Sequence, residues 1–379
     1  MNDQPVRPPD ETVIDYPLVT EQGADAPAPL SKRLRDPRTI ISIVLPLILI
    51  ALIAVTVGEI DLNELVGSIT RADPLLLLAA FGVYYLGFPL RGYRWALLLR
   101  GAGMRVSLRD STEIIFIGWL VNCLVPAKLG DVYRAYLLRL NFEVSLSRTF
   151  GTVFIERIFD LFTIVLLGLA AGFWSFRDGL SPEVQIIFGI GLAFVAALAV
   201  GLLVVRNFGR RIITRLPLPQ RATEFYERFE EGVFSIGARQ VPLLAVVTVL
   251  IWATEAMRLY LVVLALGFEF PLGISGAFFV ALIASLLTAI PLTPAGLGIV
   301  EAGVASILVG LYQATGGEAA AIVLVDRAIS VLSIIVLGSI LYLLSSKTRG
   351  GQPRQAGEVG DSSVRAASSP GASGPAPGD

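Results

Sequence analysis

The most constraining feature of this sequence is a series of long apolar stretches. Residues 39–57 and 184–205 contain no charged side chain, and each is long enough to cross the hydrocarbon core of a bilayer as a helix. Only 16% of the 379 residues are charged, and the mean hydropathy is +0.72. This composition excludes an ordinary soluble domain and predicts an all-α polytopic membrane protein.

About six stretches are expected to span the membrane, and two more are expected to form helical hairpins, which gives eight hydrophobic helical segments or more. The expected spans are residues 39–57, 74–97, 149–173, 184–205, 241–266 and 319–344. Lys and Arg gather before the first span, after the second and after the last, as they do in cytoplasmic loops. Both termini are therefore expected in the cytoplasm. The tails, residues 1–38 and 346–379, are rich in Pro, Gly or Ser and are predicted to be disordered.

The five-residue phrase Pro-Ala-x-Leu-Gly occurs twice inside apolar stretches. It reads PAKLG at residues 126–130 and PAGLG at residues 294–298, and an acid follows each phrase closely. Pro and Gly interrupt helices, and an interrupted helix with a charge at membrane depth is costly. We expect each phrase to be the tip of a hairpin, with helix breaks at Pro126, Gly130, Pro291, Pro294, Gly296 and Gly298.

The placement of Lys and Arg predicts that the two hairpins open in opposite directions. Residues 111–139 have basic residues at both ends, so the first hairpin is expected to be re-entrant and to open to the cytoplasm. With the C-terminus inside, the span 241–266 runs outward and the span 319–344 runs inward. Everything between these two spans must begin and end outside, so the second hairpin is expected to open to the exterior.

Three blocks of sequence recur in one order, which indicates an internal repeat. Arg94, before the first hairpin, matches Arg258, before the second, at an offset of 164 residues. The two tips lie 168 residues apart, and the acid–arginine phrase after each hairpin recurs at an offset of 170 residues. With hairpins of opposite orientation, these blocks predict an inverted repeat, an architecture typical of transporters.

The repeat divides the expected transmembrane domain, residues 39–345, into two halves. The first repeat is expected at about residues 74–173 and the second at about residues 241–344. The span 184–205 and a cytoplasmic loop, residues 206–240, connect them. An amphipathic helix is expected around residues 220–235 of this loop.

Charged and polar side chains accompany both hairpins and are the candidates for a substrate site. The candidate substrate-binding residues are Asn122, Lys128, Asp131, Arg134, Glu156, Arg157, Arg258, Glu301, Asp326 and Arg327. The acids at the tips, Asp131 and Glu301, are expected to pair with Arg157 or Arg327. One interpretation is that such charges form interhelical ion pairs, which we expect of Asp326 and Glu255. The other is that Arg157, Arg327 and Lys128 hold the head group of an amphiphile, helped by N–H groups freed at the breaks.

Four side chains have alternative interpretations. Arg91 and Arg94 share a helix face near the end of the second span; we expect Arg91 in a basic belt at the membrane surface, and Arg94 either there or at a lipid head group. Trp119 is either an aromatic residue of the membrane interface or a ligand contact, and we expect the first of these. Asn122 lies four residues before Pro126 and either satisfies backbone groups freed by the break or reaches the site.

The residue types that are missing exclude several kinds of chemistry. The sequence has no His and a single Cys, Cys123. Histidine-based catalysis, imidazole metal sites, cysteine clusters and intramolecular disulfides are therefore excluded. No cofactor, metal, nucleotide or nucleic-acid partner is expected, and neither is a catalytic residue.

Four phrases together resemble the lysylphosphatidylglycerol synthase transmembrane (flippase-like) family. They are Asn-x-x-x-Pro-x-x-x-Gly-Asp at residues 122–131, Glu-Arg-x-x-Asp at 156–160, Pro-x-Thr-Pro-x-Gly-Leu-Gly-x-x-Glu at 291–301, and Asp326-Arg327. The resemblance covers roughly residues 40–345. It implies a relative of the flippase half of the multiple peptide resistance factor, without the soluble aminoacyl-transferase domain.

The resemblance and the repeat lead to the same expectation, a lipid flippase or scramblase that carries out no covalent chemistry. The expected cargo is a phospholipid or a polyprenyl-linked lipid in the plasma membrane. The alternatives are a membrane enzyme acting on lipid-linked envelope precursors and an accessory subunit of an envelope-synthesis complex. Expected partners are membrane lipids, a lipid-linked substrate, and either a second copy of the chain or an envelope-synthesis protein.

Overall fold

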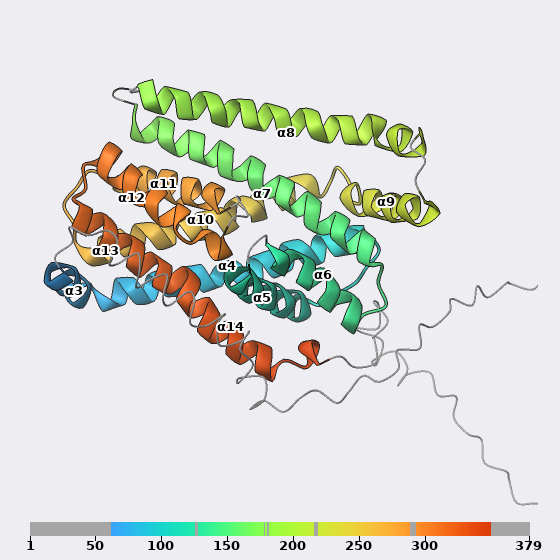
Figure 1. The fold of residues 1–379 in the computed structure, drawn as a ribbon, viewed down its shortest axis with the longest axis horizontal. Helices are drawn as coiled ribbons and strands as arrows, with labels where there is room; N and C mark the ends of the chain where they lie inside the picture. Colours follow the sequence, from blue (N-terminus) through green and yellow to red (C-terminus); the bar gives the residue numbers. More distant parts are fainter. Residues whose placement is uncertain are drawn as a thin grey trace, which may run out of the picture.

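The computed structural model describes residues 62–125, 128–177, 179, 182–215, 219–288 and 293–349, and these ranges contain helices and turns but no strand (Figure 1). The predicted all-α membrane fold is confirmed. The helices are α3 (Leu62–Arg71), α4 (Pro74–Gly101), α5 (Leu108–Leu124), α6 (Leu129–Asn141), α7 (Leu146–Ser175), α8 (Pro182–Arg215), α9 (Gln220–Val233), α10 (Val241–Leu266), α11 (Gly273–Leu287), η1 (Pro294–Gly296), α12 (Ile299–Tyr312), α13 (Gly316–Arg327), η2 (Ala328–Leu332), α14 (Ser333–Leu344) and η3 (Ser346–Thr348).

Five helical stretches of the described chain are long and apolar enough to cross a membrane. Four of them match expected spans, namely Pro74–Gly101, Phe188–Gly209, Val241–Leu266 and Gly316–Leu344. The fifth, Pro294–Tyr312, is the second half of the expected second hairpin. Helix α7 has 30 residues but carries four charged residues in its first half. The expected first span, 39–57, the expected N-terminal tail, 1–38, and residues 350–379 of the expected C-terminal tail lie outside the described residues.

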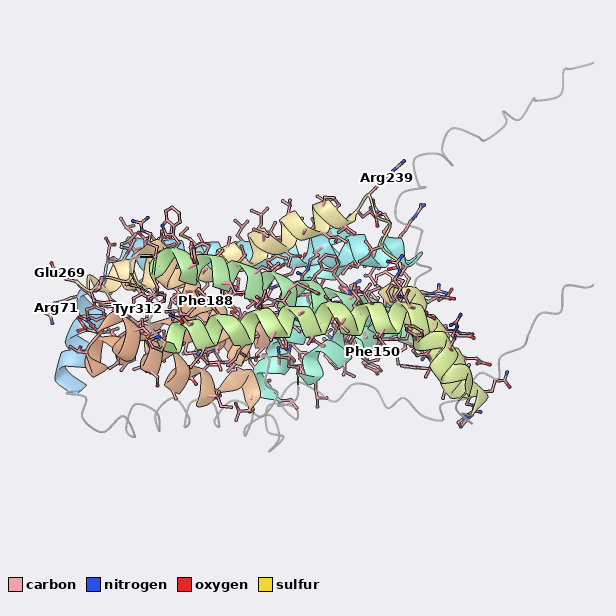
Figure 2. All side chains as sticks on the ribbon, turned by 90° about the horizontal axis from the view of Figure 1, so that it is seen from above. Arg71, Phe150, Phe188, Arg239, Glu269 and Tyr312 are labelled. Carbon is pink, nitrogen blue, oxygen red and sulfur yellow. The ribbon has the colours of Figure 1, made fainter. Side chains whose placement is uncertain are left out.

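The long helices lie side by side, so the bundle has two ends. Figure 2 shows Arg71 and Glu269 at one end and Arg239 at the other. The backbone N–H of Asp73 donates to the carbonyl of Ala265 over 2.8 Å, which puts the start of α4 beside the end of α10. Helices α4 and α10 are therefore antiparallel. They share the most extensive packing of any two described helices and form the centre of the bundle.

Helices α5 and α6 form the first hairpin, and both of its open ends are fixed to the residues that follow α14. The ammonium group of Lys347 lies 2.7 Å from a carboxylate oxygen of Asp110 in α5. The amide of Asn141, the last residue of α6, donates to the carbonyl of Lys347 over 2.9 Å. Residues 346–348 were expected in the C-terminal tail, but they form the turn η3, with Lys347 buried.

Helices α11 and α12 form the second hairpin, and its open ends lie at the opposite end of the bundle. Tyr312, the last residue of α12, packs against Gly276 near the start of α11. Its hydroxyl is 2.9 Å from that of Ser175, the last residue of α7. Because α7 runs along the bundle from the first hairpin to the second, the two hairpins enter from opposite ends (Figure 1).

Helices α8 and α9 lie on the outside of the bundle (Figure 1). Helix α8 continues to Arg215, ten residues beyond the expected end of its span, so the loop 206–240 is helical over much of its length. The amphipathic helix expected around 220–235 is α9, Gln220–Val233. An exposed ion pair of 2.5 Å between Arg148 and Glu231 joins α9 to the start of α7.

The last long helix contains a wider turn in its middle. Between α13 and α14, residues Ala328–Leu332 form the π-helical segment η2. Such segments shift the hydrogen-bond ladder and leave carbonyl groups available to other partners. The carbonyl of Ser330 accepts a 3.0 Å hydrogen bond from the hydroxyl of Tyr84 in α4. This irregular turn therefore lies against the centre of the bundle.

Candidate functional site

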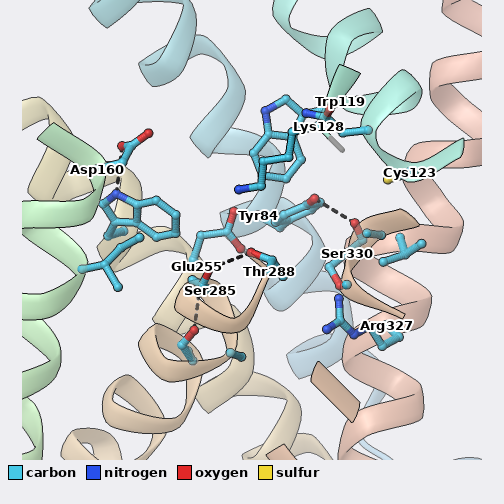
Figure 3. A pocket seen from close by; sticks show the side chains of 18 of the residues that line it. Tyr84, Trp119, Cys123, Lys128, Asp160, Glu255, Ser285, Thr288, Arg327 and Ser330 are labelled. Carbon is cyan, nitrogen blue, oxygen red and sulfur yellow. Dashed lines mark hydrogen bonds between the residues drawn. The ribbon is translucent and has the colours of Figure 1, made fainter. Parts of the chain in front are cut away.

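The two helix breaks meet in the middle of the bundle at a cavity of about 340 Å³. Its volume lies within the range of roughly 300–1,000 Å³ that is usual for ligand sites. Residues from both breaks line it, together with side chains of α4, α7, α10, α11 and the α13–η2 segment. Figure 3 shows Lys128 of the first break, Glu255 of α10 and Arg327 of α13 around it.

The first break is stabilised by Asn122 and a left-handed residue. The backbone of Lys128 has φ 51° and ψ 36°, which turns the chain into α6. The side-chain oxygen of Asn122 accepts a 2.8 Å hydrogen bond from the backbone N–H of Gly130. Gly130 lies against the carbonyl of Gly118, where a Cβ would not fit. Pro126 is outside the described residues.

The second break has a similar backbone but a different cap. Gly296 and Gly298 have positive φ values of 72° and 87°, and Gly296 ends the short helix η1, which begins at Pro294. A carboxylate oxygen of Glu301 accepts a 2.5 Å hydrogen bond from the N–H of Gly298 and caps α12. An acid near a helix N-terminus also complements the helix dipole. Pro291 is outside the described residues.

Ion pairs attach the hairpin tips to the helices that follow them. Asp131 accepts two hydrogen bonds of 2.9 Å from the guanidinium group of Arg157. Glu301 lies 2.8 Å from Arg327. The expected pairing of tip acids with these arginines is thus seen at both hairpins. Bidentate arginine–carboxylate contacts of the first kind are among the stronger polar interactions in proteins.

A second set of ion pairs links α4 to α7 and α10 to α13. Arg94 lies 3.2 Å from Glu156, and Arg258 lies 3.2 Å from Asp326. Arg94 also contacts Asp160 at 2.5 Å. Glu156 and Asp326 occupy matching positions in the repeated phrases, as do Arg94 and Arg258. Each repeat therefore contains the same two ion pairs. The acid at the hairpin tip pairs with the arginine of the acid–arginine phrase, and the acid of that phrase pairs with the arginine before the hairpin.

One ion pair joins the two repeats directly. Arg91 in α4 and Glu255 in α10 are 2.6 Å apart and 164 residues apart in the chain, the offset that relates Arg94 to Arg258. The expectation that Arg91 lies in a surface belt is wrong, since it is buried and its guanidinium group lies 4.7 Å from the centre of the Trp119 ring. Trp119 lines the cavity, which also contradicts its expected interface position.

The structure separates the ten candidate residues into two groups. Seven line the main cavity, namely Asn122, Lys128, Asp131, Arg157, Arg258, Asp326 and Arg327. Arg134 and Glu156 lie behind it and pair with each other at 3.1 Å. Glu301 lines an adjacent small cavity of about 20 Å³. The nine charged candidates, together with Arg91, Arg94, Asp160 and Glu255, lie at or behind these cavities, and we call this set of charged residues the central network. Its ion pairs form separate groups within the described residues, and Lys128 belongs to none of them. Asn122 has both of its suggested roles, because it accepts a hydrogen bond at the break and also lines the cavity.

Several lining residues were absent from the sequence-based candidate set. Glu255 and Asp160 are charged, and the Glu-Arg-x-x-Asp phrase was the available signal for Asp160. Tyr84, Ser285 and Ser330 also line the cavity. Nothing in the local sequence distinguishes them from packing residues of an apolar helix.

This arrangement suits binding of a polar, charged group inside an otherwise apolar bundle. The arginine groups offer hydrogen-bond donors and the carboxylates offer acceptors, so the cavity replaces part of the hydration of a polar ligand. Cys123, the single thiol, is buried. The geometry brings together groups for binding, and the ion pairs give those groups fixed positions.

Comparison with known proteins supports this description of the chain as a membrane protein. A UPF0104 membrane protein of Methanocaldococcus jannaschii is 35% identical over 62% of this chain and 97% of its own length. Another UPF0104 membrane protein, of Methanothermobacter thermautotrophicus, is 27% identical over 79% and 93%. The glycosyltransferase AglD of Haloferax volcanii is 28% identical over 76% of this chain, which spans about half (52%) of that protein.

The family comparison covers the two repeats and the helices between them. The model of the lysylphosphatidylglycerol synthase TM region matches residues 40–338, which include both hairpins and every charged residue of the central network. This match confirms the family expected from the hairpin and acid–arginine phrases. The chain belongs to the lysylphosphatidylglycerol synthase TM region family of membrane proteins.

Proposed function

We propose that this protein is a lipid flippase or scramblase that moves a phospholipid or a polyprenyl-linked lipid between leaflets. The observation that carries the proposal is the charged cavity where the two oppositely entering hairpins meet. The polar head group passes through this cavity while the hydrocarbon tails stay in the membrane. No bond is made or broken, and no cofactor takes part. The protein works in the plasma membrane, with both termini in the cytoplasm.

The central network supports this proposal because it lowers the barrier that a bilayer presents to a charge. A charged side chain at the centre of a bilayer costs about 2.5–3.5 kcal/mol on insertion scales, and a charged head group is disfavoured there for the same reason, the loss of its water. Arg157, Arg258 and Arg327 line the cavity and each has a carboxylate partner. When these arginines exchange a carboxylate contact for a contact to the head group, they replace the water that the head group has lost.

Alternating access follows from the opposite entry of the two hairpins. We propose that both are re-entrant, the first opening to the cytoplasm and the second to the exterior. Small rocking of one repeat against the other then exposes the cavity to one leaflet at a time. The Arg91–Glu255 ion pair lies at the contact between the repeats and is a fixed point for such a motion.

The second candidate function is an enzyme or accessory subunit that acts on lipid-linked envelope precursors. The observation that favours it is the similarity to AglD, a protein named as a glycosyltransferase. The matching part is about half of that protein. A shared membrane half is compatible with transport of a lipid-linked substrate as well as with its modification.

Reconstitution in liposomes tests the transport proposal. The full chain is placed in vesicles that contain phospholipid with a fluorescent label on an acyl chain, so that the head group stays natural. A membrane-impermeant reductant bleaches only the outer leaflet of empty vesicles, and it bleaches nearly all label where lipid crosses. Bleaching equal to that of empty vesicles would exclude transport. Conversion of a labelled lipid-linked sugar in detergent would instead support the enzyme.

The proposed orientation predicts which end of the bundle is accessible from outside the cell. In a Cys123→Ala background, single cysteines replace Glu269 and Arg239, which lie at opposite ends (Figure 2). We expect an impermeant maleimide to label position 269 in intact cells and position 239 only after permeabilisation. Lys128 and Gly296 are unsuitable reporters because both line one cavity. Labelling of 269 and 239 from the same side would contradict this topology.

A further inference from the structure

The central network contains one more positive charge than negative charge among the described residues. Each of its six carboxylates has an arginine of its own. The pairs are Asp131–Arg157 at 2.9 Å, Glu156–Arg134 at 3.1 Å, Asp160–Arg94 at 2.5 Å, Glu255–Arg91 at 2.6 Å, Glu301–Arg327 at 2.8 Å and Asp326–Arg258 at 3.2 Å. The seventh cation of the network is Lys128, which lines the cavity.

Lys128 has no ion pair within the described part of the chain. Its nearest acid in sequence, Asp131, is bound by both nitrogens of the Arg157 fork. The side chain lies near Trp119 and Tyr84 at the cavity (Figure 3). When every arginine, lysine and carboxylate is ionised, the network has a net charge of +1, and the charge without a counterion is at Lys128.

Lys128 has a backbone conformation that favours glycine over lysine. Its φ of 51° lies in the left-handed region, where a side chain carries a conformational cost that glycine avoids. The same position of the second Pro-Ala-x-Leu-Gly phrase is Gly296, with φ 72°. A glycine would therefore suit the turn better than a lysine. The lysine adds what a glycine lacks, a positive charge inside the cavity.

We infer that the cavity selects head groups with a single negative charge, as in a phosphodiester, and that Lys128 makes this selection. This inference rests on the proposed transport function. A monoanionic head group brings the network to neutrality, which is the lowest-cost state for charges held away from water. A zwitterionic head group leaves +1, a cationic one leaves +2, and a phosphomonoester approaching two negative charges leaves an excess of negative charge.

The test compares the rates at which reconstituted protein moves four lipids with identical labelled acyl chains. They are phosphatidylglycerol with one negative charge, zwitterionic phosphatidylcholine, cationic lysyl-phosphatidylglycerol, and phosphatidic acid as the phosphomonoester. We expect phosphatidylglycerol to move at least about tenfold faster than the other three, which corresponds to one unmatched charge costing about one decade. Equal rates for all four would overturn the inference and leave transport intact. Movement of none would overturn the proposed function itself.

Variants of Lys128 test whether this residue makes the selection. Lys128→Gly removes the charge and is favoured by the left-handed backbone, so its melting temperature should be no lower than that of the unmodified protein. We expect it to lose the preference for phosphatidylglycerol, whereas Lys128→Arg keeps the charge and the preference. Arg239→Gly removes one positive charge from an exposed turn and is the matched control. A Lys128→Gly protein that still prefers phosphatidylglycerol would overturn the role of Lys128.

Discussion

Replacing Glu255 with alanine is expected to destabilise the protein by about 3–5 kcal/mol, the usual cost of leaving a buried charge without its partner. The stranded charge is Arg91, which is only 4% exposed and contacts Glu255 at 2.6 Å. Arg91 has few other means of compensation, since its second terminal nitrogen has no hydrogen-bond partner among the described residues. Thermal unfolding in detergent, followed by circular dichroism, measures the loss.

A double variant separates the charge effect from simple loss of packing. Arg91→Met with Glu255→Leu removes both charges and keeps most of the side-chain volume. Replacing a buried ion pair by apolar groups of similar size is often neutral or stabilising, so the double variant should recover most of the lost stability. A Glu255→Ala protein as stable as the unmodified one, or a double variant as unstable as the single one, would contradict this account.

Replacing Arg157 with alanine is expected to slow lipid movement by roughly 10–100-fold, because hydrogen bonds to charged groups contribute about 1.5–3 kcal/mol each. Arg157 lines the cavity, holds Asp131 at the first hairpin tip through two bonds of 2.9 Å and contacts Asp160 at 3.2 Å. Without it, Asp131 keeps only a longer contact of 3.7 Å to Arg134, and the tip loses its attachment to α7. The dithionite bleaching rate of reconstituted vesicles measures the effect.

The control for this variant is Arg148→Ala on the same helix. Arg148 forms an ion pair with Glu231, but both side chains are well exposed, and exposed pairs contribute little. We expect Arg148→Ala vesicles to bleach at the unmodified rate. An Arg157→Ala protein that is folded by gel filtration and transports at the unmodified rate would show that the head group does not use this cavity.

Much of the fold was predictable because membrane helices follow simple composition rules. The expected span 241–266 coincides with α10 residue for residue. The Pro-Ala-x-Leu-Gly phrases correctly located both helix breaks, since Pro and Gly act through local backbone geometry. The pairing of Asp131 with Arg157 was predictable for another reason, since a charge at membrane depth requires a partner and few were available.

The errors arose where local sequence fits two environments equally well. Arg91 and Arg94 occupy one helix face after an apolar run, and that pattern describes a surface belt as well as a buried pair. Arg91 is buried because it pairs with Glu255, which lies far along the chain in α10. Trp119 was misplaced for the same reason, because its position follows from packing against Arg91. The excess positive charge at Lys128 depends on ion pairs between different helices, so the local sequence does not reveal it.

The Arg91–Glu255 contact also bears on how the two halves of the chain depend on each other. Both residues hold the same place in their repeats and touch each other, so they lie near the axis that relates the halves. An assembly of two identical halves would put arginine against arginine there, or glutamate against glutamate. Joining the halves in one polypeptide allows opposite charges to meet at that point. The first half has become complementary to the second, and neither is suited to pair with a copy of itself.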